Sequence, residues 1–249
     1  MKHLIAKTFV ILSLISFLIF SFSFKTGFVQ NNRISLQPSF NQKEILTYAE
    51  IDSVLNTFQK IPYKQLDKEY LKTTGYIGRP DEYKVSNKSF YKLVGKDVFK
   101  NLVGKFTVND FLPKDKYWNE NYNIADSNYI QYFLIDAEVL HRFLDLILWL
   151  NKSNYNVNGI KIMDGYRYPS FNSETGGASY SQHLYGKAID IEIGDINNDG
   201  IVDEKNDKNI IIDLLDKKII KKTGGIGLYP GTQIVHFDTR GKYARWNEQ

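Results

Sequence analysis

Two histidines and one aspartate in the C-terminal half of the chain have the types and spacing of metal ligands. His183 precedes Asp190 by seven residues, and His236 lies further along the chain. Asp190 and His236 each stand in a short segment that alternates between apolar and polar residues, which is typical of strands. If the two strands are neighbours in one sheet, the three side chains converge on one ion.

Such a set of ligands would support zinc chemistry. Two imidazoles and one carboxylate, with a fourth position left open, describe a catalytic zinc site. The positive charge that remains after one carboxylate lowers the pKa of bound water toward about 7. The spacing alone leaves a second interpretation open, in which Asp190 is a strand-end acid and His183 is a hydrogen-bonded histidine.

A second group of acids follows the first of these strands. The segment DINNDGIVDEKND places oxygen-bearing side chains at alternate positions before Gly200, as in a calcium loop of the EF-hand or dockerin type. The closing glutamate of such loops is missing, because position twelve holds Asn206. The alternative is a solvated acidic turn. The calcium ligands that this pattern predicts are Asp195, Asn197, Asp199, the carbonyl of Ile201, Asp203 and Asp207.

The pattern of apolar residues predicts the elements that must position these side chains. Asp136 is a suitable N-cap for a helix with one apolar stripe, and His141 on that helix is expected to be a surface residue rather than a ligand. The other predicted elements are a helix over 44–58, a strand over 159–167 that ends in a turn, strands over 188–193 and 234–239, and a helix over 209–220.

Composition excludes several classes of protein. The chain has 249 residues, of which 43% are hydrophobic, and carries a net charge of +4. This mild charge, without a dense run of Lys and Arg, does not favour nucleic acid as a partner. Cysteine is absent, which excludes disulfides, thiolate metal sites and a cysteine nucleophile. Any metal must therefore be held by His, Asp or Glu.

The N-terminus has the pattern of an export signal. Lys2 and Lys7 precede a run from Phe9 to Phe24 that is apolar apart from serines, and Lys25 closes it. The run is longer than most signal-peptide cores and shorter than the roughly 20 residues that span a bilayer comfortably. We expect either a cleaved signal peptide or an uncleaved membrane anchor. The rest of the chain is then expected to work outside the cytoplasm, in the periplasm or cell envelope.

Three motifs in the C-terminal half resemble those of one peptidase family. The segment SQHLYGKAID (181–190) resembles the S-x-H-x-x-G-x-A-x-D signature of the D-Ala-D-Ala metallopeptidases. These are the VanY-type zinc D,D-carboxypeptidases, which share their core with lysostaphin-type peptidases and hedgehog domains. Upstream, DGYRYPSFNSETGGAS is similar to the family's S-G-Y-R-S-P-x-Y-N-x-x-x-G-G-A-x, and downstream YPGTQIVHFDTRGKYARW resembles its closing V-H-x-D-x-R-G-x-x-A-R-W. FTVNDFL (106–112) is similar to the family's domain opening, so the resemblance covers 106–246.

The resemblance implies a role for several residues. Arg167 matches the arginine that holds the C-terminal carboxylate of a peptide, a task that suits its planar fork of donors. The alternative for Arg167 is a surface ion pair, and Asp164 stands where the family pattern has serine. The implied zinc ligands are His183, Asp190 and His236, and the implied substrate-binding residues are Arg167, Tyr166 and Ser181.

The general base stays open. Many relatives place a carboxylate three residues before the last ligand, or a second histidine two before it, whereas this chain has Gln233 and Ile234. Neither side chain can take a proton. Asp238 shares a strand face with the last ligand and Glu192 shares one with Asp190, so both are candidates for proton transfer. Asp238 is favoured because its H-x-D arrangement belongs to the closing motif. Either acid could instead orient a histidine ligand.

The sequence therefore predicts an α+β domain over 106–249, in which helices flank a small antiparallel sheet that carries a zinc site. Residues 1–25 are expected to be the signal peptide or anchor, and 26–105 a tether and an N-terminal region without an assigned role. The expected function is zinc-dependent hydrolysis of peptidoglycan stem peptides at D-amino acid bonds, by a D-Ala-D-Ala carboxypeptidase or D,D-endopeptidase. The alternatives are a non-catalytic wall-binding module with the same fold and a calcium-braced adhesion domain.

Overall fold

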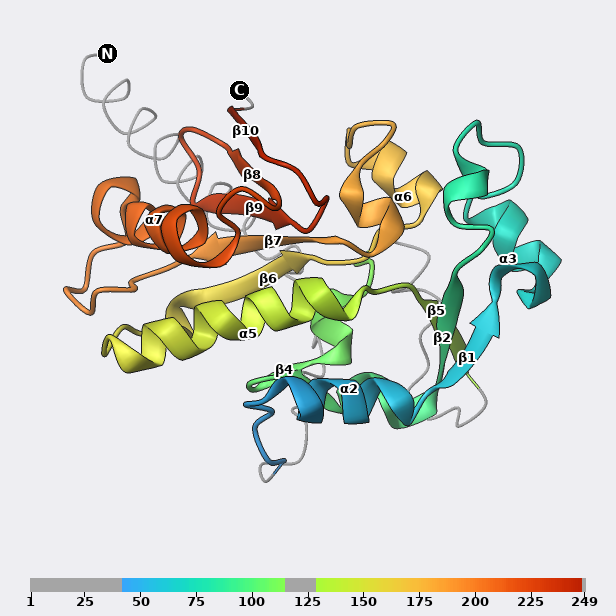
Figure 1. The fold of residues 1–249 in the computed structure, drawn as a ribbon, viewed down its shortest axis with the longest axis horizontal. Helices are drawn as coiled ribbons and strands as arrows, with labels where there is room; N and C mark the ends of the chain where they lie inside the picture. The colour runs from blue at the N-terminus through green and yellow to red at the C-terminus, as the bar shows by residue number, and fades with distance from the viewer. Residues whose placement is uncertain (1–41, 115–128, 248–249) are drawn as a thin grey trace, which may run out of the picture. The chain divides into compact units, whose positions relative to one another are not determined.

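A five-stranded sheet carries the C-terminal motifs (Figure 1). In the computed structural model, which describes residues 42–114 and 129–247, neighbouring strands of this sheet run antiparallel except for one parallel pair at its edge. The predicted α+β fold with a helix-flanked, mainly antiparallel sheet is confirmed. The strand order is β10 (Ala244–Asn247), β8 (Gly225–Leu228), β9 (Ile234–Asp238), β7 (Ala188–Ile193) and β6 (Ile160–Asp164).

One face of this sheet is apolar and is covered by a long helix. Helix α5 (Ala137–Lys152) begins at Asp136, whose side chain accepts a hydrogen bond from the backbone of Glu138. Its buried stripe meets the sheet where the rings of Phe143 and Phe237 stack 6.3 Å apart. Figure 1 shows α5 lying alongside β6 and β7. Because side chains alternate along a strand, the polar partners of Phe237 on β9 face the opposite side.

A helical run connects β7 to β8. The predicted helix over 209–220 is present but begins earlier, and π turns flank its central α-helical part. Ile211 and Leu215 are fully buried from this run. Its parts are η7 (Glu204–Lys208), α7 (Asn209–Leu214) and η8 (Leu215–Ile219).

The N-terminal half contributes a second, three-stranded antiparallel sheet in the order β1-β2-β5 and short helical turns. The predicted helix over 44–58 is shorter, because Thr47 caps it. The elements are α2 (Tyr48–Asn56), β1 (Gln59–Pro62), η1 (Tyr63–Gln65), α3 (Lys68–Thr73), η2 (Glu82–Lys84), β2 (Ser89–Val94), η3 (Gly95–Phe99), β3 (Asn101–Val103), β4 (Phe106–Thr107), η4 (Val108–Phe111) and β5 (Ile130–Phe133). Later turns and helices are η5 (Val157–Gly159), α6 (Pro169–Glu174) and η6 (Gln182–Tyr185).

The described parts of the two halves share one hydrophobic core. Buried side chains from Ile51 through Phe237 belong to a single cluster. The predicted boundary between residues 105 and 106 falls inside the β3–β4 hairpin, where Val103 pairs with Phe106. His141 stacks on Tyr48 of α2 with ring centroids 4.3 Å apart. This histidine therefore belongs to the contact between α2 and α5.

The predicted export segment, residues 1–25, and the first part of the predicted region 26–105 fall within residues 1–41, outside the described residues. Among the residues that are described, no helix is both long and apolar enough to cross a membrane.

Candidate metal centre

The three predicted ligands meet on the face of the sheet that α5 does not cover. Strands β7 and β9 are antiparallel neighbours, and Asp190 is the direct cross-strand partner of His236. His183 comes from η6, just before β7, where Gly186 turns the chain with a φ of 67°. A Cβ on Gly186 would lie 2.3 Å from the carbonyl oxygen of Leu134. The turn that brings His183 over the strand therefore requires glycine.

The donor atoms of the triad are close enough to hold one ion. His183 Nε2 lies 3.1 Å from His236 Nδ1 and 3.1 Å from Asp190 Oδ1, and His236 Nδ1 lies 2.7 Å from Asp190 Oδ1. Ligand atoms around a tetrahedral zinc, at about 2.0–2.1 Å from it, are roughly 3.3 Å apart. All three residues are buried. Two imidazole nitrogens and a carboxylate oxygen at these separations fit zinc.

Hydrogen bonds on the outer side of each imidazole fix which nitrogen faces the centre. His183 Nδ1 lies 2.5 Å from the carbonyl oxygen of Gly165, which can only accept. His236 Nε2 lies 3.0 Å from Asp238 Oδ2. Each ring thus donates outward and turns a lone pair inward, the tautomer that a metal needs. The inward atoms are Nε2 of His183 and Nδ1 of His236.

The electrostatics of the triad are those of a site made for a cation. Burial acts to raise the pKa of Asp190, but the charge and hydrogen bonds of the two histidines outweigh it and hold this pKa well below its usual range. Burial acts to lower the pKa of His236, yet Asp190 and Asp238 raise it to about 9. Asp190 and Asp238 thus favour positive charge at this position. A divalent cation held by the triad would supply that charge.

Arg167 holds the second oxygen of the ligand carboxylate. Its Nη2 donates to Asp190 Oδ2 at 2.5 Å and to Asp164 Oδ2 at 2.8 Å. This contact leaves Oδ1 of Asp190 for the metal. The aspartate that replaces the family's serine thus pairs with the arginine. Nε of Arg167 is buried and has no hydrogen-bond partner among the described residues.

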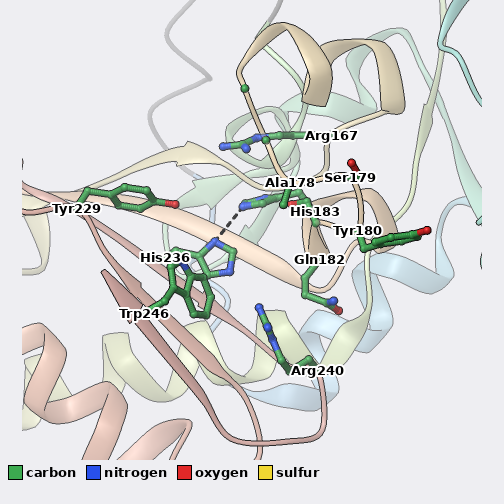
Figure 2. A pocket seen from close by; sticks show the side chains of 13 residues that line it. Arg167, Ala178, Ser179, Tyr180, Gln182, His183, Tyr229, His236, Arg240 and Trp246 are labelled. Carbon is green, nitrogen blue, oxygen red and sulfur yellow. Dashed lines mark hydrogen bonds between the residues drawn. The ribbon is translucent and has the colours of Figure 1, made fainter. Parts of the chain in front are cut away.

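The triad opens into a cleft of about 490 Å³. One wall is the segment 176–182, which includes the predicted substrate-binding residue Ser181. Figure 2 shows His183 and His236 between Arg167 on one side and Arg240 on the other. The remaining lining residues, Tyr229 and Trp246, come from the closing motif. The cleft can therefore offer a metal, two guanidinium groups and aromatic surface to one ligand.

Two predicted site residues lie elsewhere. Tyr166 is fully buried and its hydroxyl lies 2.7 Å from that of Tyr76, so a direct contact with substrate does not fit the structure. Glu192 forms an ion pair with Lys161 at 3.0 Å on the neighbouring strand and does not line the cleft. It is two residues along β7 from Asp190, which carries its carboxylate away from the centre.

Asp238, which the sequence favours as the general base, is completely buried beneath His236. Its oxygens accept hydrogen bonds from His236, from the backbone of Gly225 at 3.0 Å and from the guanidinium of Arg240 at 2.6–3.0 Å. Burial acts to raise the pKa of Asp238, but the bonds from His236 and Arg240 keep it far below its usual value. This arrangement supports the alternative role, in which Asp238 orients a ligand.

The acidic loop is organised around its own backbone. Asp195 accepts hydrogen bonds from the backbone of Asp199 and Gly200, and Asp207 accepts them from Ile196 and Asn197. Within the described residues, the triad is the one group of three or more His, Asp or Glu ligand atoms that gathers within 4.8 Å. The calcium prediction for the loop therefore has no support from its geometry.

The N-terminal half supports the cleft through residues that the sequence did not indicate. Arg79 donates from Nη2 to the carbonyl oxygen of Ser179 at 2.9 Å, in the wall of the cleft. The same guanidinium grips Asp81 through two bonds, and Asp81 accepts from the hydroxyl of Tyr185 at 2.6 Å. These contacts join the segment just before η2 to η6 and to the cleft wall that precedes it, across about 100 residues of sequence, and no local pattern could have shown them.

Tyr229, Arg240 and Trp246 are also cleft residues that the sequence analysis missed. Their signal was their place within the closing motif. Trp246 lies over His236 with ring centroids 5.1 Å apart and under the guanidinium of Arg240 at 4.8 Å. It thus covers one side of the metal centre.

The geometry agrees with one comparison with known proteins. Residues 139–238 match the family model of Peptidase M15. No curated protein and no solved structure matches the chain. The matched segment runs from α5 to the end of β9 and contains all three ligands. The resemblance predicted from the three motifs is confirmed: the chain carries a domain of the Peptidase M15 metallopeptidases, the D-Ala-D-Ala carboxypeptidase and hedgehog-like family, with an intact His-Asp-His metal site.

Proposed function

We propose that this protein is a zinc-dependent peptidase that hydrolyses peptidoglycan stem peptides at bonds to D-amino acids, and that it works outside the cytoplasm. The observation that carries the proposal is the convergence of His183, Asp190 and His236 at one wall of a cleft. Export rests on the N-terminal sequence.

The protein's own residues prepare the site in three ways. Gly165 and Asp238 fix the two imidazoles, so that no reorientation is needed when the metal binds. Arg167 holds one oxygen of Asp190 and presents its guanidinium to the cleft. Trp246 limits access of water to His236. Zinc, when bound, polarises the scissile carbonyl and lowers the pKa of water.

The two guanidinium groups support a substrate with carboxylates near the scissile bond. Arg167 lines the cleft, and its planar fork of donors suits a carboxylate. Arg240 is held by Asp238 on one edge and lines the cleft. Stem peptides that end in D-Ala-D-Ala offer a terminal carboxylate one residue from the bond to be cleaved. This chemistry favours the carboxypeptidase over the endopeptidase.

One observation favours a second function. Among the described residues that line the cleft, none is acidic, so the usual carboxylate base is not at the surface of the site. A wall-binding module that retains the metal would need no base. The two functions share the metal and differ in turnover.

The test uses the full chain, loaded with zinc. Metal is measured by elemental analysis, and cleavage by release of D-alanine from a peptide ending in D-Ala-D-Ala and of new amines from cross-linked muropeptides. We expect one zinc per chain and D-alanine release. His183→Ala should lose both, whereas the matched control His141→Ala, which alters a histidine of α5, should keep both. Zinc without cleavage of either substrate would support the binding module, and a chain without zinc would overturn both functions.

A further inference from the structure

A buried lysine joins the acidic loop to the cleft. Lys208, at the end of η7, is only 3% exposed. Its ammonium donates to the carbonyl oxygens of Tyr229 at 2.9 Å and Thr232 at 2.6 Å, and to Glu204 at 3.2 Å. A buried charge is costly unless such partners surround it. Two of the three partners are backbone atoms of the turn between β8 and β9, so Lys208 fixes that turn.

The acidic loop over 195–207, whose spacing resembles a calcium loop, holds Lys208 in position. Asp207, beside it, is completely buried and accepts hydrogen bonds from three backbone N–H groups, those of Ile196, Asn197 and Asp203. Asp203 in turn caps η7 by accepting from the backbone of Asn206 at 2.6 Å. The loop is therefore locked by its own carboxylates. These hydrogen bonds hold the start of the helical run from which Lys208 extends.

The turn that Lys208 holds carries a phenol into the cleft. Tyr229 follows β8 directly and lines the cleft together with His183 and His236. In Figure 2 its hydroxyl points into the space between Arg167 and the histidine pair.

The other phenol of the cleft faces away. Tyr180 is 58% exposed, its ring lies beneath the ammonium of Lys84 at 4.5 Å, and in Figure 2 it points away from the histidines. The cleft residues that the structure describes include no acid. Tyr229 is thus the phenol of the cleft whose hydroxyl faces the histidines.

We propose that Tyr229 is a catalytic residue, whose hydroxyl donates a hydrogen bond to the oxygen of the scissile carbonyl as negative charge develops on it, and that Lys208 is the positioning residue that holds Tyr229 in place. The proposal rests on the peptidase function proposed above. A donor that is already aimed at a developing charge stabilises the transition state more than the ground state, and removal of one such donor typically costs about 10²–10³-fold in kcat.

The first experiment compares Tyr229→Phe with the control Tyr83→Phe in the full, zinc-loaded chain. Tyr83 is 66% exposed and is not among the residues that line the cleft. Tyr229→Phe should lower kcat by about 10²-fold with little change in KM, and should leave the zinc content unchanged. Calorimetry with a phosphinic peptide, whose tetrahedral anion resembles the transition state, gives a readout without turnover. The affinity for the phosphinic peptide should fall by a similar factor. The affinity for the product peptide, which has no tetrahedral anion, should not fall. Tyr83→Phe should change none of these values.

The second experiment is a double-mutant cycle with Lys208→Met. If Lys208 acts through Tyr229, Lys208→Met lowers kcat and phosphinate affinity in the wild-type background but has almost no further effect in the Tyr229→Phe background. Amide exchange of residues 229–232 should become faster in Lys208→Met. Losses that multiply across the cycle would overturn the positioning role, because they indicate a general loss of stability.

The two proposals fail separately. If the wild-type chain cleaves no wall peptide but binds the phosphinate in a Tyr229-dependent manner, the proposed substrate is wrong, and the contact of Tyr229 with a tetrahedral anion stands. If the wild type cleaves wall peptides and Tyr229→Phe retains full kcat and phosphinate affinity, the role of Tyr229 is overturned and the peptidase proposal stands.

Discussion

Asp190 and His236 face each other directly across two antiparallel strands, with Oδ1 and Nδ1 2.7 Å apart. Because they are cross-strand partners, the pairing of β7 with β9 also brings these two ligands together. His183 reaches the same point from the turn before β7. An ion at this point binds three side chains that the unfolded chain holds far apart, so it must stabilise the folded state.

The first prediction concerns removal of the metal. A ligand present at 100 times its Kd stabilises the native state by about 2.7 kcal/mol, so a zinc chelator should lower the Tm of the loaded chain by several degrees. Differential scanning calorimetry with and without chelator measures this change. The Tm of His183→Ala should not respond to chelator. An equal shift in both proteins would place the metal elsewhere.

The second prediction concerns Asp238. Because this carboxylate is buried and bonded to His236 and Arg240, Asp238→Asn should weaken zinc binding by about 10–100-fold. Competition with a chromophoric chelator measures the affinity. Glu192→Gln is the control, because Glu192 pairs with Lys161 at the surface, and it should leave the affinity unchanged. A general base would show the reverse pattern, with unchanged zinc affinity and a loss of kcat of about 10²–10⁴-fold at saturating zinc.

The elements that hold the ligands could be predicted because their patterns are local. AIDIEI alternates so clearly that the predicted strand and β7 have the same bounds, and the cap and stripe of α5 are equally plain. The alternation also shows that Asp190 and His236 lie opposite the apolar face. The ligands come together only because the two strands pair. The sequence alone left open whether they do.

The residues that were misplaced depend on contacts between distant segments. Tyr166 follows a register shift in β6, between Ile162 and Asp164, and is buried against Tyr76 of the N-terminal half. Alternation places Glu192 on the face of Asp190, but the partner opposite it on β6 is Lys161. The N-terminal strands, of two to six residues, are too short for a periodic signal.

The third prediction concerns acid. Burial acts to raise the pKa of Asp81, but hydrogen bonds from Arg79 and Tyr185 outweigh it and lower this pKa below its ordinary value. A lowered carboxyl pKa adds stability that is present above the unfolded-state value and is lost as the pH falls through the folded-state value. The free energy of unfolding should therefore decrease below about pH 4, as urea titrations at pH 3 and pH 6 would measure.

Asp81→Asn isolates this contribution. The variant should lose about 1.5–3 kcal/mol at pH 6, because bonds to a charged group are removed from a buried position, and should show a smaller change between pH 6 and pH 3 than the wild type. Since Arg79 also holds Ser179 in the wall of the cleft, KM should rise. Asp213→Asn is the control, because Asp213 pairs with Lys217 on an exposed surface. An equal acid response in wild type and Asp81→Asn would contradict the assignment.

The last prediction concerns the aromatic cover of the centre. A Cβ on Gly227 would lie 2.6 Å from the indole of Trp246, so Gly227→Ala must displace this ring from His236 and Arg240. Overpacking of this kind typically costs about 1–3 kcal/mol, and chemical unfolding measures it. In a Trp246→Ala background the same substitution meets no indole and should cost much less, which gives a coupling energy between the two positions. A cost that is equal in both backgrounds would mean that the strain of Gly227→Ala comes from the strand rather than from the indole. A cost that depends on the indole would mean that Trp246 can lie against the metal ligand His236 because Gly227 has no side chain.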